Sequence, residues 1–217
     1  MPTERRRFDA VVFDNDGLLL ETEGAWTLAE ERMFAAYGKV FTIEHKRELL
    51  GKAGAPAEAV LANLLERPDD GPALLRELQA MALEQIGRLA QPRPGAVELL
   101  ARLRHERMPL GLASNATRVL VDRALATAGI SQELFVATLA GDEVAHPKPA
   151  PDIYLAICEA LDSEPARTAV LEDSPTGVAA ARAAGCFVIG IPSVPGVVLD
   201  AASVTAPSLA LAPLWSA

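Results

Sequence analysis

The sequence has little cysteine, a deficit of basic residues and no long apolar run, and each shortage narrows the possibilities. Cys158 and Cys186 are the only cysteines among 217 residues, and they stand far apart in apolar surroundings. We expect packed thiols in a reducing compartment, with a disulfide or a metal pair as the second interpretation. No uninterrupted apolar stretch is long enough to span a bilayer. The sequence therefore predicts a cytoplasmic protein that has no membrane partner.

The charge balance is acidic, with 20 lysines and arginines against 29 aspartates and glutamates and a formal net charge of −9. A nucleic-acid surface needs a basic face, so nucleic acid is not an expected partner. A small anionic substrate remains compatible, because a few local cations can reverse the field inside a pocket. Hydrophobic residues make up 50% of the chain, which predicts a packed globular protein with one α/β domain and a smaller lobe.

Strand-like and helical segments alternate along most of the chain. Short apolar runs predict strands at 8–14, 109–113, 134–139, 168–172 and 186–191, and a short edge strand near 202–205. The intervening segments predict helices at 95–107 and 151–161, and two more helices that end at Gly129 and at Gly185. This alternation is typical of an α/β fold, with a Rossmann-like parallel sheet and helices on both faces.

Residues 20–89 break the alternation, because almost nothing in them has the pattern of a strand. Helices are expected at 22–37, 44–50, 56–66 and 73–89. We interpret 20–89 as an inserted α-helical cap domain, and 1–19 with 90–217 as the core domain. The run Leu18–Leu20 is then expected to be the packed hinge between the two.

Polar residues follow four of the predicted strands. They are Asp14 and Asp16 after 8–14, Ser114 and Asn115 after 109–113, Lys148 in the loop after 134–139, and Glu172, Asp173 and Ser174 after 168–172. Ligands of open parallel sheets bind beyond the carboxyl ends of the strands, so these side chains are expected at one edge. Taken alone, each is more often a turn residue, a helix cap or a surface charge; their common edge favours a site.

Carboxylates at close range cannot all stay ionised without cations. Mg²⁺ prefers oxygen ligands and is compatible with a site that also holds phosphate. Lys148 adds a positive charge, and lysine is scarce here, with four lysines against sixteen arginines. Helices expected after Ser114-Asn115 and at Ser174-Pro175 offer N–H groups to an anion.

Four segments in order resemble the motifs of the haloacid dehalogenase (HAD)-type phosphohydrolases. They are FDNDGLLLETE (13–23), GLASNA (111–116), HPKPAPDIY (146–154) and LEDSPTGVAAARAAG (171–185). The resemblance covers essentially the whole chain and points to the branch with a helical cap, which includes sugar-phosphate phosphatases and β-phosphoglucomutase.

The resemblance implies a role for each matching residue. Asp14 would be the nucleophile that forms an aspartyl-phosphate, and Asp16 would be the acid and then the base. Ser114, the Asn115 backbone and Lys148 would hold the phosphoryl oxygens, and Lys148 would also offset the charge of Asp14.

The resemblance also implies a magnesium site and an exit from the sheet. Mg²⁺ would be held by Asp14, by the main-chain carbonyl of Asp16 and by Asp173, with Glu172 binding directly or through water. Gly17 would let the chain turn sharply toward the cap.

Departures from the family pattern bear on the substrate. The mutase branch has a histidine where this chain has Trp26 and an arginine near the position of Gly54, so both residues favour a phosphatase. Lys52 is expected to reach over the substrate, together with Trp26. The pair Glu21-Thr22 replaces an Asp-Ser that is common in the family and is expected not to affect the chemistry.

The sequence therefore predicts a Mg²⁺-dependent phosphatase of small phosphorylated metabolites, such as sugar or polyol phosphates, that acts through an aspartyl-phosphate. A phosphomutase of the β-phosphoglucomutase type is the nearest alternative. A non-catalytic protein that senses phosphate is the second. The short cap favours a monomer.

Overall fold

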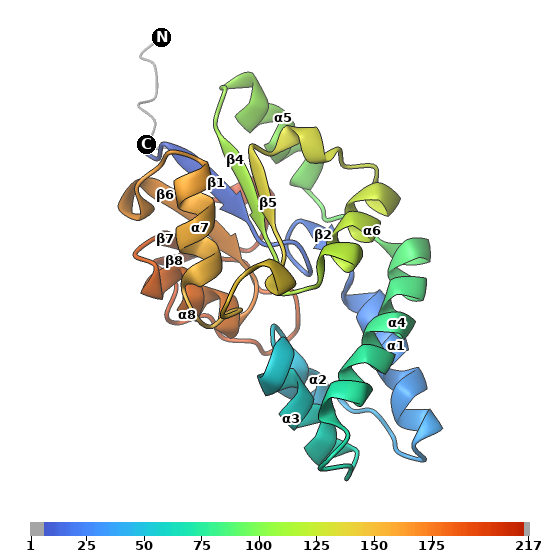
Figure 1. Ribbon diagram of the computed structural model, residues 1–217. Helices are drawn as coiled ribbons and strands as arrows, with labels where there is room; N and C mark the ends of the chain where they lie inside the picture. The colour runs from blue at the N-terminus through green and yellow to red at the C-terminus, as the bar shows by residue number, and fades with distance from the viewer. Residues whose placement is uncertain (1–6, 215–217) are drawn as a thin grey trace.

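The computed structural model describes residues 7–214, and its centre is a six-stranded parallel sheet (Figure 1). In spatial order the strands are β5 (Ala137–Leu139), β4 (Leu110–Ala113), β1 (Ala10–Phe13), β6 (Thr168–Glu172), β7 (Phe187–Gly190) and β8 (Val204–Thr205). Strand β1 pairs on both sides, so that Val12 lies opposite Gly111 on β4 and Val170 on β6. The predicted Rossmann-like α/β fold is confirmed.

Helices cover both faces of this sheet, which is why its central strands are almost wholly apolar. Helices α5 (Ala96–His105) and α6 (Arg118–Ala128) pack on the face that carries Val11 and Phe13. Helices α7 (Asp152–Ala160) and α8 (Pro175–Ala183) pack on the opposite face, against Ala10 and Val12 (Figure 1). The alternation of side chains along β1 therefore feeds two separate cores.

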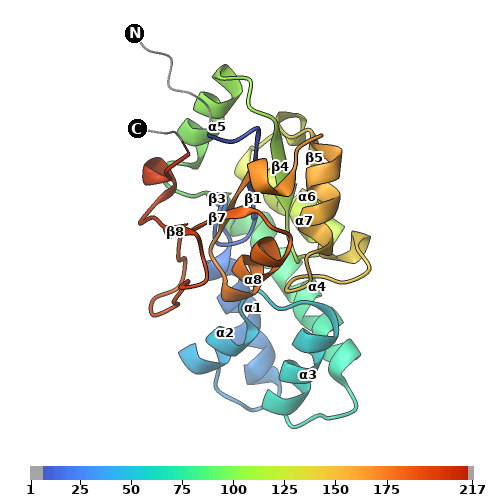
Figure 2. The same ribbon diagram turned by 90° about the vertical axis from the view of Figure 1, so that its left-hand side faces the viewer.

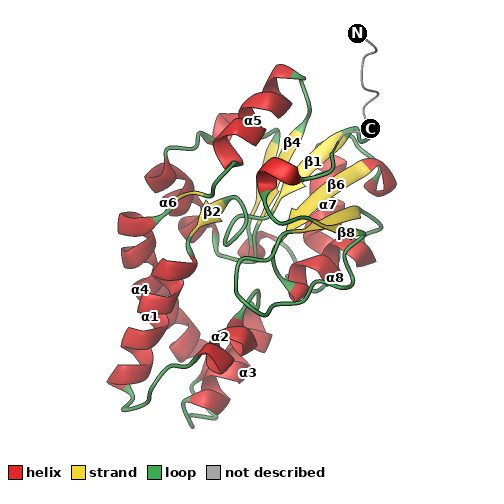
Figure 3. Cartoon of the chain, turned by 180° about the vertical axis from the view of Figure 1, so that it is seen from behind, coloured by secondary structure: helices red, strands yellow, loops and turns green. Residues whose placement is uncertain are grey.

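Four helices, here named the cap helices, lie together beyond the carboxyl ends of the strands (Figures 1 and 2). They are α1 (Glu23–Ala36), α2 (Ile43–Leu49), α3 (Gly54–Leu64) and α4 (Gly71–Leu89). Helix α4 packs against α1 and α3 within this group, and also against α6 of the core. Seen from behind, the helical group and the sheet form two distinct parts of the molecule (Figure 3).

The two crossings between sheet and cap helices run side by side. Strand β2 (Leu20–Glu21) pairs antiparallel with β3 (Gln91–Pro92), so a short strand occurs where the sequence showed almost no strand pattern. A two-residue strand is too short to show a period of two. Leu18, Leu19 and Leu20 are fully buried, so this run is packed as expected, and its role as a hinge stays a prediction.

The two cysteines meet on the far side of the sheet from α5 and α6. The Sγ atoms of Cys158 and Cys186 are 3.9 Å apart, and both thiols are free and buried, so the prediction of packed thiols is confirmed. Among residues 7–214, no helix combines the length and the apolar character needed to cross a bilayer.

Candidate active site

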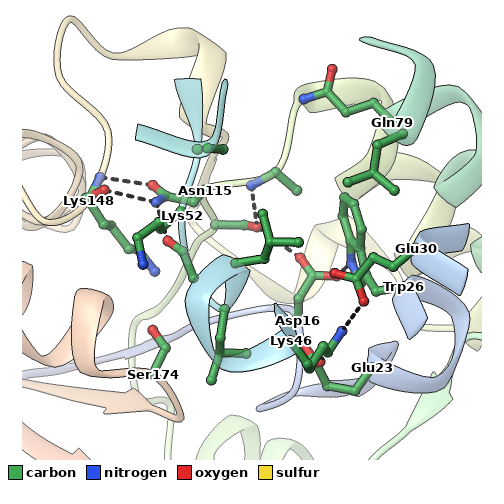
Figure 4. A pocket seen from close by; sticks show the side chains of 18 of the residues that line it. Asp16, Glu23, Trp26, Glu30, Lys46, Lys52, Gln79, Asn115, Lys148 and Ser174 are labelled. Carbon is green, nitrogen blue, oxygen red and sulfur yellow. Dashed lines mark hydrogen bonds and ion pairs between the residues drawn. The ribbon is translucent and has the colours of Figure 1, made fainter. Parts of the chain in front are cut away.

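The predicted site residues gather in one pocket between the carboxyl edge of the sheet and the cap helices (Figure 4). Its lining includes Asp14, Asp16, Ser114, Asn115, Lys148, Asp173 and Ser174 from the core, and Trp26 and Lys52 from the cap helices and their loops. Glu172 is the exception, because it is fully buried beneath the pocket and does not line it. Four segments far apart in the sequence therefore meet as predicted.

A tight loop follows β1 and contains Asp16. The N–H of Leu20 donates to the carbonyl of Asn15, and the N–H of Gly17 donates to the carbonyl of Leu20, both at 2.9 Å. Gly17 has a φ of 78°, and a Cβ on it would lie 2.2 Å from Oδ2 of Asp173. Only glycine fits both constraints, which agrees with the predicted sharp exit from the sheet.

Lys148 is the buried cation of the site. Its Nζ donates to Oδ1 of Asp14 at 2.6 Å, to Oε1 of Glu172 at 2.7 Å and to the carbonyl of Ala113 at 2.9 Å. Burial alone would lower the pKa of Lys148, but the two carboxylates outweigh it and hold the pKa above its usual range. The side chain is therefore a fixed ammonium that neutralises part of the charge on Asp14.

Glu172 is enclosed by hydrogen-bond donors. Its Oε1 accepts from Lys148 and from the hydroxyl of Tyr154, which lies 2.5 Å away. Its Oε2 accepts from the N–H groups of Asp173 and Ser174 and from the Ser174 hydroxyl. A Cβ at Gly177 would lie 1.8 Å from Oε1, so glycine is needed for α8 to approach this closely. Glu172 therefore anchors Lys148 from below.

Three carboxylates are close enough to share a cation. Oxygens of Asp14, Glu172 and Asp173 lie within 4.8 Å of one another. Burial, and then the neighbouring carboxylates, raise the pKa of Asp173 well above its usual value, and burial does the same for Asp14 against the opposing effect of Lys148. A hard divalent cation takes an all-oxygen donor set of this kind and would relieve the repulsion, so these residues fit such an ion.

Asp16 is held by neutral donors from both parts of the molecule. Its Oδ1 accepts from the hydroxyl of Thr22 at 2.8 Å and from Nε1 of Trp26 at 3.3 Å. Its Oδ2 accepts from the hydroxyl of Ser114 at 3.1 Å and from Nδ2 of Asn15 at 3.2 Å. The contact with Thr22 is not expected from the sequence, where the Glu21-Thr22 pair is predicted to have no effect on the chemistry. The Thr22 hydroxyl nevertheless contacts Asp16.

Asn115 joins the core to the loop before α3. Its Nδ2 donates to the carbonyls of Gly51, at 2.8 Å, and Lys148, at 3.0 Å, and its Oδ1 accepts from the Lys148 N–H at 2.8 Å (Figure 4). The side chain is therefore fully engaged. The neighbouring Ser114 is held as well, because its Oγ accepts from the N–H of Ala116.

The sequence missed several residues of the site. The hydroxyl of Ser193 donates to Oδ2 of Asp173, although Ser193 lies in no recognised motif. On the cap side, Lys46 forms ion pairs with Glu23 at 2.8 Å and with Glu30 at 3.0 Å, and all three line the pocket. The only available signal was the seven-residue spacing of the two glutamates on α1, which places them on one helix face.

The chain is similar to known proteins over most of its length. Residues 8–185 match the family model of the haloacid dehalogenase-like hydrolases. Protein CbbY of Rhodobacter capsulatus is 36% identical over 203 residues, covering 85% of each chain. The probable pseudouridine-5'-phosphatase of Drosophila melanogaster is 34% identical over 192 residues, covering 86% of this chain and 83% of that protein.

Solved structures agree with the sequence comparison. A crystal structure of a CbbY variant from Rhodobacter sphaeroides in complex with xylulose-(1,5)bisphosphate superposes with a TM-score of 0.80 at 29% identity. The match covers 94% of this chain and 95% of that one.

Proposed function

Because the chain belongs to the haloacid dehalogenase-like hydrolases, we propose that it hydrolyses phosphoric monoesters of small metabolites, namely sugar or polyol phosphates. The observation that carries this proposal is the pairing of Asp14 with the buried Lys148 at 2.6 Å, on the same pocket wall as Asp16. The names of the relatives support it, since they include a probable pseudouridine-5'-phosphatase and a fructose-1-phosphate phosphatase of Escherichia coli.

In the first step, a carboxylate oxygen of Asp14 attacks phosphorus and the bond to the leaving alcohol breaks, which gives an aspartyl-phosphate. Asp16 donates a proton to the leaving oxygen. Lys148 keeps Asp14 in a single position and lowers the repulsion between its carboxylate and the incoming phosphate. The four neutral donors around Asp16 fix its orientation without adding a charge.

In the second step, water attacks the phosphorus of the aspartyl-phosphate. Asp16, now a carboxylate, takes the proton from that water, and the Asp14 carboxylate and inorganic phosphate are released. The hydroxyl of Ser114, the N–H of Asn115 and the ammonium of Lys148 hold the phosphoryl oxygens through both steps.

The residues that would hold Mg²⁺ are Asp14, Asp173 and the main-chain carbonyl of Asp16, with Glu172 binding directly or through water. When bound, the ion supplies positive charge that offsets the carboxylates and the phosphoryl oxygens. The contacts of Glu172 also favour a positioning role, in which it holds Lys148 in place, because both of its oxygens already accept hydrogen bonds.

We propose that residues 20–89 act as a cap that closes over the pocket, excludes bulk water during phosphoryl transfer and excludes large substrates. Trp26 and Lys52 line the pocket from this side and would reach over the substrate, Trp26 at the part beyond the phosphate and Lys52 on the side of Asn115 and Lys148. We further propose a cytoplasmic monomer without a nucleic-acid or membrane partner.

Phosphate release from a panel of phosphorylated metabolites, with Mg²⁺ and with EDTA, tests the proposal. Wild-type protein is expected to release phosphate only with Mg²⁺, and Asp14→Asn is expected to release none above background. Equal rates for the two proteins would refute the enzyme proposal and leave a phosphate-sensing protein. Isomerised hexose phosphate in place of free phosphate would instead identify a phosphomutase.

The role of Asp16 has its own test. Asp16→Asn is expected to lose far more activity on a sugar phosphate, whose alcohol leaves poorly, than on p-nitrophenyl phosphate, whose phenolate needs no proton. An equal loss on both substrates would contradict its role as the acid.

A further inference from the structure

We propose that Glu23, Glu30 and Lys46, here named the cap triad, restrict the enzyme to monophosphates whose remaining part is uncharged and carries hydroxyl groups. Resting on the proposed function, the inference concerns which phosphate esters the pocket accepts. A second phosphate on the substrate is the group that the triad excludes.

The cap triad lies where the leaving group must extend. In Figure 4 Glu23, Glu30 and Lys46 gather on the side of Asp16 and Trp26, while Lys148, Asn115 and Lys52 gather on the opposite side. The phosphoryl group belongs with Lys148. The oxygen that Asp16 protonates links the phosphoryl group to the rest of the substrate. The rest of the substrate therefore points toward the triad.

The charges of the triad leave no cation free for a second phosphate. Lys46 pairs with both carboxylates, at 2.8 and 3.0 Å, so the triad has one more negative than positive charge. Burial alone would lower the pKa of Lys46, but Glu23 and Glu30 raise it above its usual range, so the ammonium stays charged. Burial raises the pKa of Glu30, yet protonation of Glu30 would make the triad neutral and never positive.

The two other cations that line the pocket, Lys52 and Lys148, lie on the phosphoryl side. Lys52 donates to the carbonyl of Glu48 at 2.5 Å and lies beside Asn115 and Lys148 in Figure 4. A phosphate near the triad would therefore meet carboxylates without a free partner, which is an effective way to reject a substrate. An uncharged part with hydroxyl groups, in contrast, can donate hydrogen bonds to the carboxylates of Glu23 and Glu30, and its carbon skeleton can pack on Trp26.

The cost of the triad also points to a function. Side chains of Lys46 and Glu30 are 8% and 5% exposed, and the adjoining pocket wall is built from Leu49, Leu61 and Leu78. A buried ion cluster in such a wall contributes little to stability compared with apolar residues of similar volume. Its position on the pocket is consistent with selection of the substrate.

Matched substrate pairs test the inference. The ratio of kcat/KM for glucose 6-phosphate over glucose 1,6-bisphosphate, and for fructose 1-phosphate over fructose 1,6-bisphosphate, is measured for wild type, Glu23→Gln and Glu30→Gln. For the pair whose monophosphate is hydrolysed faster, the wild type is expected to favour the monophosphate over the bisphosphate by about tenfold or more. Each variant is expected to lower that ratio severalfold, because one negative charge is lost. The ratio does not depend on how much of a variant is folded.

Glu84→Gln is the matched control, because Glu84 is 53% exposed on α4 and pairs with Arg32 outside the pocket. This variant makes the same change in net charge and is expected to keep the wild-type ratio. Ratios near one in wild type, or ratios unchanged in Glu23→Gln and Glu30→Gln, would overturn the inference. Absence of turnover by the wild type on every ester, p-nitrophenyl phosphate included, would instead overturn the proposed function.

Discussion

The two tyrosines of the chain allow one hydrogen bond beneath the site to be measured against an internal reference. Each hydroxyl donates to a glutamate: Tyr154 to Glu172 at 2.5 Å, and Tyr37 to Glu77 at 2.9 Å. Tyr154 and Glu172 are both fully buried, whereas Tyr37 is only partly buried. The same Tyr→Phe substitution therefore removes the same kind of bond in two different surroundings.

The expected losses differ because of burial. A hydrogen bond to a charged group contributes about 1.5–3 kcal/mol, and Tyr154→Phe is expected to lower the free energy of unfolding by an amount in that range. Glu172 keeps Lys148 and Ser174 as donors, so the loss is not expected to reach the larger cost of an unpaired buried charge. Tyr37→Phe is expected to cost less than about 1 kcal/mol, because water can replace its hydroxyl.

Equilibrium unfolding in urea, followed by circular dichroism with EDTA present, gives both free energies without a contribution from bound metal. Equal losses for Tyr154→Phe and Tyr37→Phe, or a larger loss for Tyr37→Phe, would refute the view that Glu172 is stabilised by its buried donors. Since Glu172 anchors Lys148, Tyr154→Phe is also expected to lower kcat, whereas Tyr37→Phe is expected to leave kcat unchanged.

Three further substitutions test other parts of the site. Gly17→Ala is expected to cost about 1–2 kcal/mol from its positive φ alone, and to lower kcat/KM by about 10²-fold because the new Cβ displaces Asp173; near-wild-type kinetics would contradict this packing. Asp173→Asn is expected to raise the free energy of unfolding in EDTA, because it removes a buried, repelled charge, and to abolish the stabilisation that Mg²⁺ gives the wild type in a thermal melt; a loss of stability in EDTA would oppose that reasoning. Trp26→Phe removes the Nε1 donor to Asp16 and is expected to slow sugar-phosphate hydrolysis more than p-nitrophenyl phosphate hydrolysis, a difference that steady-state assays on both substrates would reveal or exclude.

Much of the fold could be predicted because apolar runs mark buried parallel strands. Strands expected at 168–172 and 109–113 are observed at Thr168–Glu172 and Leu110–Ala113. The strand expected at 134–139 is shorter, because a 3₁₀ turn occupies Gln132–Leu134 and only Ala137–Leu139 pairs with β4. Pairing with a neighbour decides where a strand begins, and the apolar run does not record it.

The meeting of Asp14, Lys148 and Asp173 could likewise be predicted, because the carboxyl ends of parallel strands share one edge. No comparable rule predicts the contacts between the cap helices and the edge of the sheet. The approach of Thr22 to Asp16 depends on the tight loop at Gly17 and on the pairing of β2 with β3, and neither has a pattern in the sequence.

The cap triad shows the same limit more strongly. Lys46 lies on α2, while Glu23 and Glu30 lie on α1, so their ion pairs depend on how two helices pack. The sequence indicated Lys52 and Trp26 as cap residues over the substrate, and both line the pocket. Their contacts with a substrate remain a prediction.

Whether Asp14 accepts the phosphoryl group can be tested directly by trapping the aspartyl-phosphate. Asp16→Asn protein is mixed with ³²P-labelled acetyl phosphate and Mg²⁺, quenched in acid and digested, since this variant can form the intermediate from a good leaving group but hydrolyses it slowly. Radiolabel is expected on the peptide that contains Asp14, and none when Asp14→Asn is added to the same chain. Label on any other peptide, or label that persists without the Asp14 carboxylate, would contradict this role of Asp14.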